Sequence, residues 1–362
     1  MKKRILYAVL AALLLTGCSN GGSGDTHEDS QSTDDGSALG SITVPSETET
    51  QESSEPDPEP ENKRIYPDNA YKPLDRSLFT DDIEESGTVV KFNYDTVDNV
   101  GGGDTVYQKY ALVYLPAGYD ENDTETRYNV MYLMHGGSDS PAWFLTGEGK
   151  ASPLSRLLDH LIASGEMEPL ILCAVSYYTE YRSDDTQNCI NFHHELMNDI
   201  IPVFESKFHT YAEDVTPEGI AASRLHRAFG GFSMGAVTTW ATFENRLDSI
   251  AYYMPISGDC WALGGTAGGS KPMLTAEHLA DAITKSGFTA EDFYIYTGCG
   301  ENDMARPNLE PQAEAMKQLS DTFIYCDNFS DGNFYFCLHE GGGHDRGTVL
   351  NVMYNGLPKM FG

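Results

Sequence analysis

Apolar runs rich in β-branched and aromatic residues recur along the chain and predict eight strands. The predicted strands cover 88–94, 106–115, 129–134, 170–176, 227–232, 250–256, 293–297 and 333–339. Apolar residues at three- and four-residue spacing predict helices over 152–165, 195–208, 234–244, 275–286, 308–319 and 347–361. The first two strands form a predicted hairpin, and strand and helix alternate afterwards. This order predicts an α/β fold, a mostly parallel sheet with helices on both faces.

The N-terminal segment 1–17 has the pattern of an export signal. Three basic residues precede an apolar run over 5–15, which is shorter than the roughly 20 residues that cross a bilayer. The sequence Leu15-Thr16-Gly17-Cys18 resembles the bacterial lipobox, and this resemblance implies cleavage before Cys18 and lipidation of its thiol. We therefore expect a lipid-anchored lipoprotein at the cell surface or on the periplasmic side of a bacterial membrane. An ordinary secretory signal with an incidental cysteine is the alternative.

A change of composition near residue 62 separates two further parts of the chain. Residues 18–62 are mainly Ser, Thr, Gly, Pro, Asp and Glu, a composition that predicts a disordered acidic tether. Residues 63–362 have the mixed composition and length of a single domain. The formal net charge of −32 argues against a nucleic-acid partner and against direct adsorption to anionic lipid. The lipid anchor is thus the only membrane attachment that we expect.

Six cysteines lie in the predicted domain, and no CxxC or Cys/His spacing indicates zinc. Asp331-Gly332 is a two-residue hairpin signal, and such a turn would place Cys326 opposite Cys337. Unpaired buried thiols are the alternative.

The sequence Gly231-Phe232-Ser233-Met234-Gly235 lies between the predicted strand 227–232 and the helix that follows it. A serine on such a sharp turn is held above the sheet edge, while the flanking glycines let neighbouring backbone pass closely. The N-terminus of the following helix offers free N–H groups and a positive dipole end. This pattern indicates the nucleophile elbow of a serine hydrolase, with Ser233 as the nucleophile.

Serine needs a general base, which in this architecture follows the nucleophile in the chain. His344 lies in the glycine-rich loop after the last predicted strand, so it reaches the same sheet edge, and we predict it as the base. His278 lies within a helical pattern and His339 ends a strand. His226 precedes Ser233 by seven strand residues, which separates them by roughly 20 Å.

The acid of the triad should also follow a late strand. Asp303, in the loop after 293–297, is the predicted acid, and Asp259 and Glu301 are the alternatives. An oxyanion hole is needed as well. We predict its donors to be the N–H groups of Met234 and of Gly137, which lies in a glycine-containing loop after 129–134. His135 in the same loop is predicted to form structural hydrogen bonds.

Several segments, in order, resemble the feruloyl esterases of carbohydrate esterase family 1, which are esterase D-like α/β-hydrolases. They are YLPAGYD, YLMHGG, HRAFGGFSMG, SGDCW, GEND followed by MARPNLEPQAEAMK, and GGGHD. The resemblance covers roughly residues 65–362 and assigns nucleophile, acid and base to Ser233, Asp303 and His344. It implies hydrolysis of ferulate or acetate esters on plant cell-wall polysaccharide without a cofactor. It also suggests that Trp261, and less directly Trp143, contact the substrate ring.

Two further motifs carry no predicted chemistry. His193 and His194 are adjacent, so on a helix they point about 100° apart and do not converge on a metal ion; we interpret 191–195 as a helix start. GGTAGGS, residues 264–270, is predicted to be a flexible loop. Three other functions stay open: an acetylxylan esterase, a siderophore trilactone esterase, and a non-catalytic glycan-binding protein that has kept the fold.

Overall fold

The computed structural model describes residues 71–328 and 330–362, which belong to one compact unit, 63–362. The predicted signal peptide, lipidated Cys18 and acidic tether lie outside the described residues, so they stay predictions. Among the described residues, no helix combines the length and the apolar character that crossing a membrane would require.

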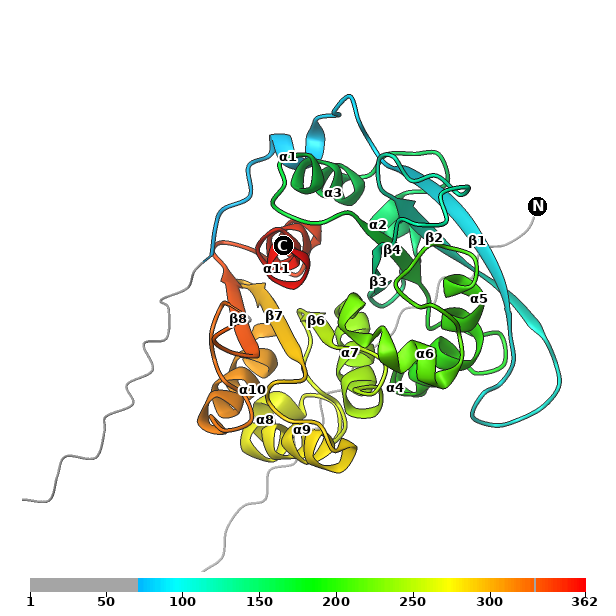
Figure 1. Cartoon of the computed structure of the whole chain (residues 1–362). Coiled ribbons are helices and arrows are strands. Elements are labelled where there is room, and N and C mark those ends of the chain that lie inside the picture. Colours follow the sequence, from blue (N-terminus) through cyan, green and yellow to red (C-terminus); the bar gives the residue numbers. More distant parts are fainter. Residues whose placement is uncertain (1–70, 329) are drawn as a thin grey trace, which may run out of the picture. The chain divides into compact units, whose positions relative to one another are not determined.

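A single sheet of eight strands forms the centre of the described unit (Figure 1). Its spatial order is β1-β2-β4-β3-β5-β6-β7-β8, and only the β1–β2 and β2–β4 pairs are antiparallel. The eight predicted strands are confirmed, with ends that differ by at most three residues. The strands are β1 Thr88–Thr96, β2 Tyr107–Leu115, β3 Asn129–Met134, β4 Leu170–Val175, β5 Arg227–Phe232, β6 Tyr252–Ile256, β7 Tyr294–Gly300 and β8 Phe334–His339.

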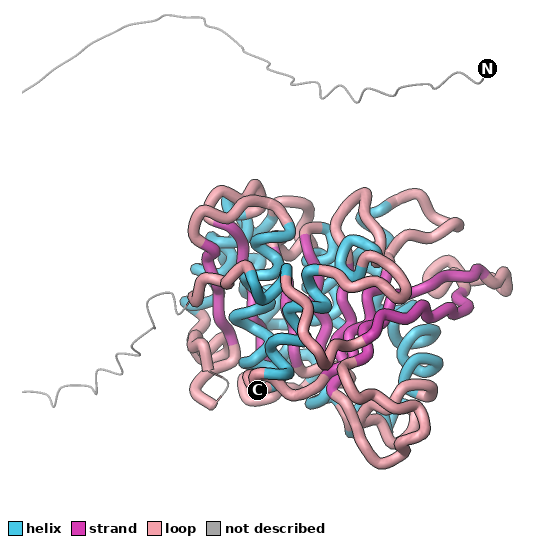
Figure 2. The backbone as a smooth tube through the Cα atoms, turned by 90° about the horizontal axis from the view of Figure 1, so that it is seen from above, coloured by secondary structure: helices cyan, strands magenta, loops and turns pink. Residues whose placement is uncertain are grey.

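Helices cover both faces of this sheet, as the alternation of strand and helix predicts. Figure 1 shows α3 and α11 on one face and α4, α7, α9 and α10 on the other. Figure 2 shows the long β1–β2 pair extending beyond the remaining strands. The helices are α1 Ser77–Thr80, α2 Ala142–Leu145, α3 Pro153–Ala163, α4 Asp185–Glu195, α5 Ile201–Glu205, α6 Pro217–Ala222, α7 Met234–Asn245, α8 Ala267–Ser270, α9 Pro272–Ser286, α10 Arg306–Gln318 and α11 Arg346–Phe361.

The predicted bounds of the helix over 195–208 are wrong. Helix α4 begins ten residues earlier, where the Asp184 side chain accepts a hydrogen bond from the backbone N–H of Gln187. A π-helical turn, Leu196–Ile200, then joins α4 to α5. The segment 191–195 therefore ends a helix and does not start one. Asp184, as a capping residue, was the sequence signal for the start of α4. The π-helical turn changed the spacing of the apolar residues, so the helical pattern was placed too late in the chain.

Two loop predictions also differ from the structure. The segment 264–270 contains the helix α8, whose Gly268 N–H donates to the Asp259 carboxylate. In the segment before β8, the backbone N–H of Cys326 donates to Phe334, so Cys326 does not face Cys337. The Asn333 side chain accepts from Ile324 N–H and holds a wider loop there than a two-residue hairpin. All six cysteines of the described ranges are unpaired.

A buried ion pair fixes the start of β5, the strand that leads to the predicted nucleophile. Arg227 in β5 and Glu205 in α5 are both almost fully buried, and their charged atoms lie 2.7 Å apart. The Tyr132 hydroxyl from β3 donates to the same carboxylate at 2.9 Å. Because every charged atom of the pair has a partner, the pair joins α5 to two central strands without leaving a buried charge uncompensated.

Candidate active site

Ser233 occupies the turn between β5 and α7 with φ of 58° and ψ of −116°. This conformation is strained for a residue with a side chain, as expected at a nucleophile elbow. A Cβ at Gly231 would collide with the backbone of Gly235, and one at Gly235 would collide with the backbone carbonyl of Met134. Both glycines are therefore required by close backbone packing, and together they expose the Ser233 hydroxyl at the sheet edge.

The structure brings the three predicted triad side chains together. Nε2 of His344 lies 3.0 Å from Oγ of Ser233, and Nδ1 of His344 lies 2.7 Å from Oδ1 of Asp303. The three residues follow β5, β7 and β8, which are parallel, so their loops meet at one edge of the sheet. This is the geometry of a hydroxyl nucleophile, a base and an orienting carboxylate.

Asp303 is buried and depends on three hydrogen bonds. Burial alone would raise its pKa, but hydrogen bonds from His344, from the Ser257 hydroxyl and from the backbone N–H of Ala305 outweigh burial and lower the pKa. The Ser257 hydroxyl lies 2.5 Å from Oδ2 and the Ala305 N–H 2.8 Å from Oδ1. The carboxylate thus stays ionised beside the imidazole. Sequence reasoning missed Ser257, although its place directly after β6, at the same sheet edge, was a usable signal.

Different structural features fix the two predicted oxyanion donors, the N–H groups of Met234 and Gly137. The N–H of Met234 is the first in α7, so it has no acceptor within the helix. The carbonyl oxygen of Gly136 lies 2.7 Å from Nδ1 of His135 and 3.4 Å from the Tyr177 hydroxyl. In a trans peptide the C=O and N–H point in opposite directions. The N–H of Gly137 therefore points away from His135 and Tyr177, and both Gly136 and Gly137 line the triad cavity.

The segment after β4, Ser176-Tyr177-Tyr178, anchors this oxyanion loop from behind. Nε2 of His135 lies 2.8 Å from the Ser176 hydroxyl, and the N–H of Ser138 donates to the Tyr178 hydroxyl at 2.7 Å. Burial lowers the pKa of His135 to about 4, so the ring is neutral near pH 7. The structural role predicted for His135 is consistent with these contacts. The tyrosines were missed, because no sequence spacing links them to residues 135–138.

A cavity of about 370 Å³ opens over the triad. The Trp143 ring lies parallel to Phe232, with centroids 5.0 Å apart, and Phe232 in turn lies 4.6 Å from the His344 ring. Trp143 lines this cavity, as do the charged residues Asp139, Asp345 and Arg346. Trp261 is not part of the lining. Its substrate contact stays a prediction.

The alternative acids are engaged elsewhere. The Asp259 carboxylate accepts from the indole N–H of Trp261 at 3.0 Å and from the backbone N–H of Gly268 at 2.9 Å. The Glu301 carboxylate accepts from the N–H of Gly341 at 2.9 Å. Both carboxylates therefore hold loops together, and neither contacts His344 in the described structure.

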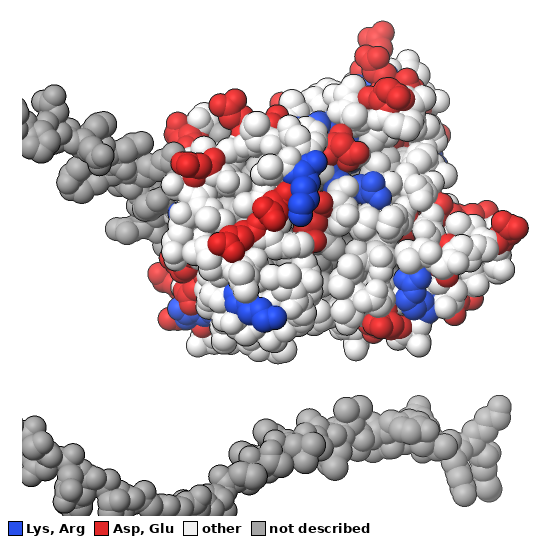
Figure 3. Space-filling view, turned by 90° about the horizontal axis from the view of Figure 1, so that it is seen from below, with Lys and Arg blue, Asp and Glu red and all other residues white. Residues whose placement is uncertain are grey.

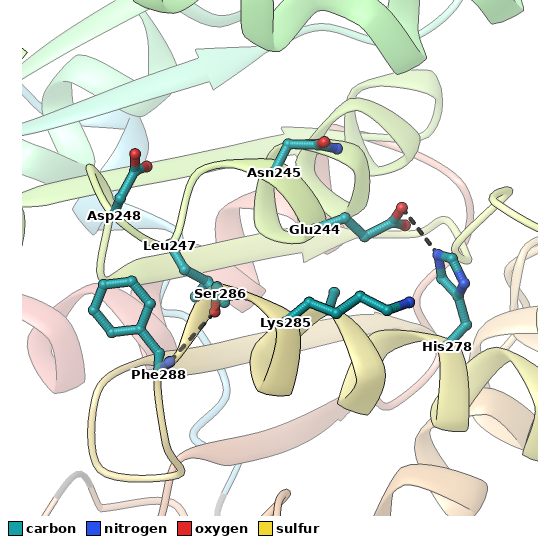
Figure 4. A pocket seen from close by; sticks show the side chains of 9 residues that line it. Glu244, Asn245, Leu247, Asp248, His278, Lys285, Ser286 and Phe288 are labelled. Atoms are coloured by element: carbon teal, nitrogen blue, oxygen red, sulfur yellow. Dashed lines mark hydrogen bonds and ion pairs between the residues drawn. The ribbon is translucent and has the colours of Figure 1, made fainter.

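The other candidate histidines lie apart from the nucleophile. His339 contacts the Thr348 hydroxyl, and His226 directly precedes β5, at the opposite end of that strand from the elbow. His278 pairs with Glu244 in a second cavity of about 490 Å³, between α7 and α9 (Figure 4). No triad residue lines this second cavity. The described ranges contain no group of three or more His, Cys, Asp or Glu that could hold a metal ion.

Comparison with known proteins agrees with this geometry. No family model matches the chain. A solved structure, a serine-to-alanine mutant of the feruloyl esterase module from Clostridium thermocellum in complex with sinapinate, is 39% identical. It covers 82% of this chain and 95% of the module, with a TM-score of 0.70. The chain belongs to the carbohydrate esterase family 1 feruloyl esterases.

Two other matches show how much of a longer relative the chain covers and how widely the fold is shared. Endo-1,4-beta-xylanase Y of Acetivibrio thermocellus is 40% identical over 293 residues, which are 80% of this chain. The chain spans only 24% of the length of that xylanase. A CE1 ferulic acid esterase from Anaeromyces mucronatus, solved in complex with ferulic acid, is 18% identical with a TM-score of 0.57. This match covers 79% of the chain and 95% of the fungal protein, and it supports the fold alone. The predicted α/β-hydrolase fold is confirmed.

Proposed function

We propose that this feruloyl esterase family member hydrolyses feruloyl and related hydroxycinnamoyl esters of plant cell-wall polysaccharide. The observation that carries the proposal is the Ser233–His344–Asp303 arrangement, with contacts of 3.0 and 2.7 Å. It lies in a domain 39% identical to a feruloyl esterase module that was solved with sinapinate.

The reaction follows from this geometry in two halves. The Ser233 hydroxyl attacks the ester carbonyl while His344 takes its proton, and Asp303 stabilises the resulting imidazolium. The N–H groups of Gly137 and Met234 bind the oxyanion of the tetrahedral intermediate. His344 then protonates the leaving alkoxide, and the acyl group remains on Ser233. Water, deprotonated by His344, attacks the acyl-enzyme and releases the carboxylic acid and the free serine.

Other acyl groups would use the same triad. An acetylxylan esterase or a trilactone esterase would differ only in the walls of the cavity, since the triad determines the reaction class and not the substrate. Trp143 and Phe232 give the cavity an apolar wall beside the nucleophile, which favours an acyl group larger than acetyl. A glycan-binding protein without catalysis is the least favoured alternative, because all three triad residues are present and in contact.

The deciding experiment compares hydrolysis of methyl ferulate, an aryl acetate and acetylated xylan by the wild-type protein and by Ser233→Ala. A kcat/KM for methyl ferulate well above that for the acetates, and lost in the variant, is the expected result. Activity on the acetates alone would move the assignment to deacetylation. Absence of serine-dependent turnover on all three substrates would refute the proposal.

For localisation, we propose that the protein is a lipoprotein, anchored through Cys18 at the cell surface or on the periplasmic side of a bacterial membrane. The support is the sequence Leu15-Thr16-Gly17-Cys18 after a basic and apolar segment. Esterase activity should fractionate with membranes in the wild type and appear in the soluble fraction after Cys18→Ala. Activity that stays with the membrane in this variant would contradict lipid anchoring at Cys18.

A further inference from the structure

The catalytic base His344 follows three consecutive glycines, Gly341, Gly342 and Gly343. Glycine has the least restricted backbone of any residue, so the local sequence imposes little conformational preference on this loop. A general base must nevertheless lie within hydrogen-bond reach of its nucleophile, and a misplacement of about 1 Å can lower a rate about a hundredfold. Contacts from outside the loop must therefore hold His344 in place.

The loop that carries the triad acid holds the first part of this glycine run. Oε2 of Glu301 accepts from the N–H of Gly341 at 2.9 Å, and the N–H of Asn302 donates to the carbonyl oxygen of Gly342 at 2.8 Å. These contacts join the loop after β7 to the loop after β8. They leave the peptide group that enters His344 to a different anchor.

Thr348, fully buried in the first turn of α11, supplies this anchor and a second one. Its hydroxyl donates to the carbonyl oxygen of Gly343 at 2.6 Å, and its backbone N–H donates to the Asp345 carboxylate at 3.0 Å. Because a peptide group is planar, fixing the Gly343 carbonyl also fixes the direction in which the backbone enters His344. The Asp345 contact caps α11 and fixes the backbone that leaves His344. One threonine thus holds the loop on both sides of the base.

A second histidine orients the Thr348 hydroxyl. Nδ1 of His339, at the end of β8, lies 3.1 Å from Oγ1 of Thr348. A carbonyl oxygen can only accept, so the hydroxyl gives its hydrogen to Gly343 and accepts one from Nδ1 of His339. A Cβ at Gly342 would collide with both Nδ1 of His339 and the Thr348 hydroxyl, so only a glycine at this position lets the loop pack against the pair.

We propose that Thr348, oriented by His339, is the positioning residue of the catalytic base and sets the rate at which His344 activates Ser233. Thr348 does not line the triad cavity, so it acts through the backbone of the loop and not through the substrate. The inference rests on the proposed function, because it concerns the same triad.

The test compares two variants of Thr348 on methyl ferulate. Thr348→Val keeps the shape and the backbone N–H but loses the hydroxyl, whereas Thr348→Ser keeps the hydroxyl. We expect kcat to fall about ten- to hundredfold in Thr348→Val, with KM changed by less than about threefold, and to stay within about threefold of the wild type in Thr348→Ser.

Thr275→Val is the matched control. Thr275 is also fully buried near the start of a helix, α9, and its hydroxyl donates to the backbone carbonyl of Lys271 at 3.1 Å. It loses the same group as Thr348→Val, at a site that does not contact the base loop. Its kcat should equal that of the wild type.

Labelling of Ser233 by a fluorophosphonate gives a readout that depends on no particular ester. Oγ of Ser233 bonds to phosphorus, His344 takes the serine proton, and fluoride leaves, so the labelling rate depends directly on the placement of the base. This rate should fall in Thr348→Val by the same factor as kcat. His339→Leu should lower it too, and His339→Asn should restore most of it, because its amide N–H can replace the donor at Nδ1. These two variants test the same hydrogen-bond chain if Thr348→Val does not fold.

The outcomes separate the positioning role from the fold and from the proposed substrate. Wild-type labelling rates in Thr348→Val and His339→Leu, or a loss that Thr348→Ser or Thr275→Val shares, would overturn the positioning role. A wild-type protein that is labelled at Ser233 but does not hydrolyse methyl ferulate would refute the proposed substrate, and the labelling rates would then decide the role of Thr348.

Discussion

At the scale of single residues, the oxyanion loop shows how a catalytic group can be held by residues that do not contact the substrate. The N–H of Ser138 donates to the Tyr178 hydroxyl, and Ser138 has a positive φ of 61°. A residue with a side chain adopts this conformation only where its surroundings enforce it. Tyr178 is thus a positioning residue for the neighbouring N–H of Gly137.

Tyr178→Phe is predicted to lower kcat about tenfold and to change KM less than threefold, since the oxyanion develops only after binding. Affinity for an aryl boronic acid, which mimics the tetrahedral intermediate, should fall in parallel with kcat. Tyr181→Phe removes a hydroxyl three residues further along the chain that forms no described hydrogen bond with the loop, and it should match the wild type. If Tyr178→Phe raised KM and left kcat unchanged, the positioning role would be excluded.

At the scale of elements, the β5–α7 elbow depends on backbone packing that only glycine permits. An alanine Cβ at Gly235 would meet the backbone carbonyl of Met134 in β3. Gly235→Ala is therefore predicted to destabilise the fold by about 2–4 kcal/mol, measured by urea unfolding. At Gly265, whose added Cβ would lie 4.0 Å from Trp261, the same substitution should change stability by less than about 1 kcal/mol. Equal stabilities for the two variants would contradict the packing argument.

Elements whose signals are local were predictable from the sequence, and elements set by tertiary contacts were not. The strands and the elbow follow from apolar runs and glycine spacing, and the triad follows because loops after parallel strands share an edge. The π-helical turn Leu196–Ile200 broke the helical period and obscured the start of α4. The helix α8 arises within a glycine-rich segment that is held by Asp259. The contact between Ser138 and Tyr178 joins residues distant in the chain, so no sequence periodicity predicts it.

At the scale of the whole molecule, the charge of the chain is strongly negative, at −32. Figure 3 shows one face of the described domain, on which Asp and Glu side chains are scattered among uncharged residues and Lys and Arg are sparse. Such a surface repels anionic polymers and favours solubility. A neutral polysaccharide is not repelled by such a surface.

Acid stability of the whole molecule is predicted to depend on the buried His193. Burial first, and then the positive charge of Arg246, lower the pKa of His193 to about 3. The unfolded chain binds a proton below its ordinary histidine pKa of about 6.5, while the folded state does not until pH falls to about 3. The contribution of His193 to the free energy of unfolding should therefore decrease as pH falls through this window, by about 1.4 kcal/mol per pH unit.

Urea unfolding of wild type and His193→Gln between pH 6 and pH 4 measures this contribution, and the variant should show the shallower pH dependence. His278 is a control whose pKa shifts in the opposite direction, so its pH-dependent contribution lies in a different pH range. The hydrogen bond that the Glu244 carboxylate accepts from His278 raises the pKa of His278, so its stabilisation is fully present below about pH 6.5 and is lost as pH rises above that value. His278→Gln should accordingly leave the decline between pH 6 and pH 4 close to that of the wild type, because the contribution of His278 changes only above its ordinary pKa of about 6.5. A pH dependence of His193→Gln that is parallel to that of the wild type would rule out the assignment to His193.

The unpaired thiols of the described domain have a practical consequence for handling and labelling. Cys173, Cys189, Cys260, Cys299 and Cys337 are buried, whereas Cys326 is partly exposed just before β8. Burial strongly raises the pKa of the Cys173 and Cys260 thiols, which keeps them protonated and unreactive. Reducing agents should therefore leave the activity of this domain intact. Cys326 becomes a natural attachment point for a maleimide dye or a surface support, on a loop that contributes none of the triad residues.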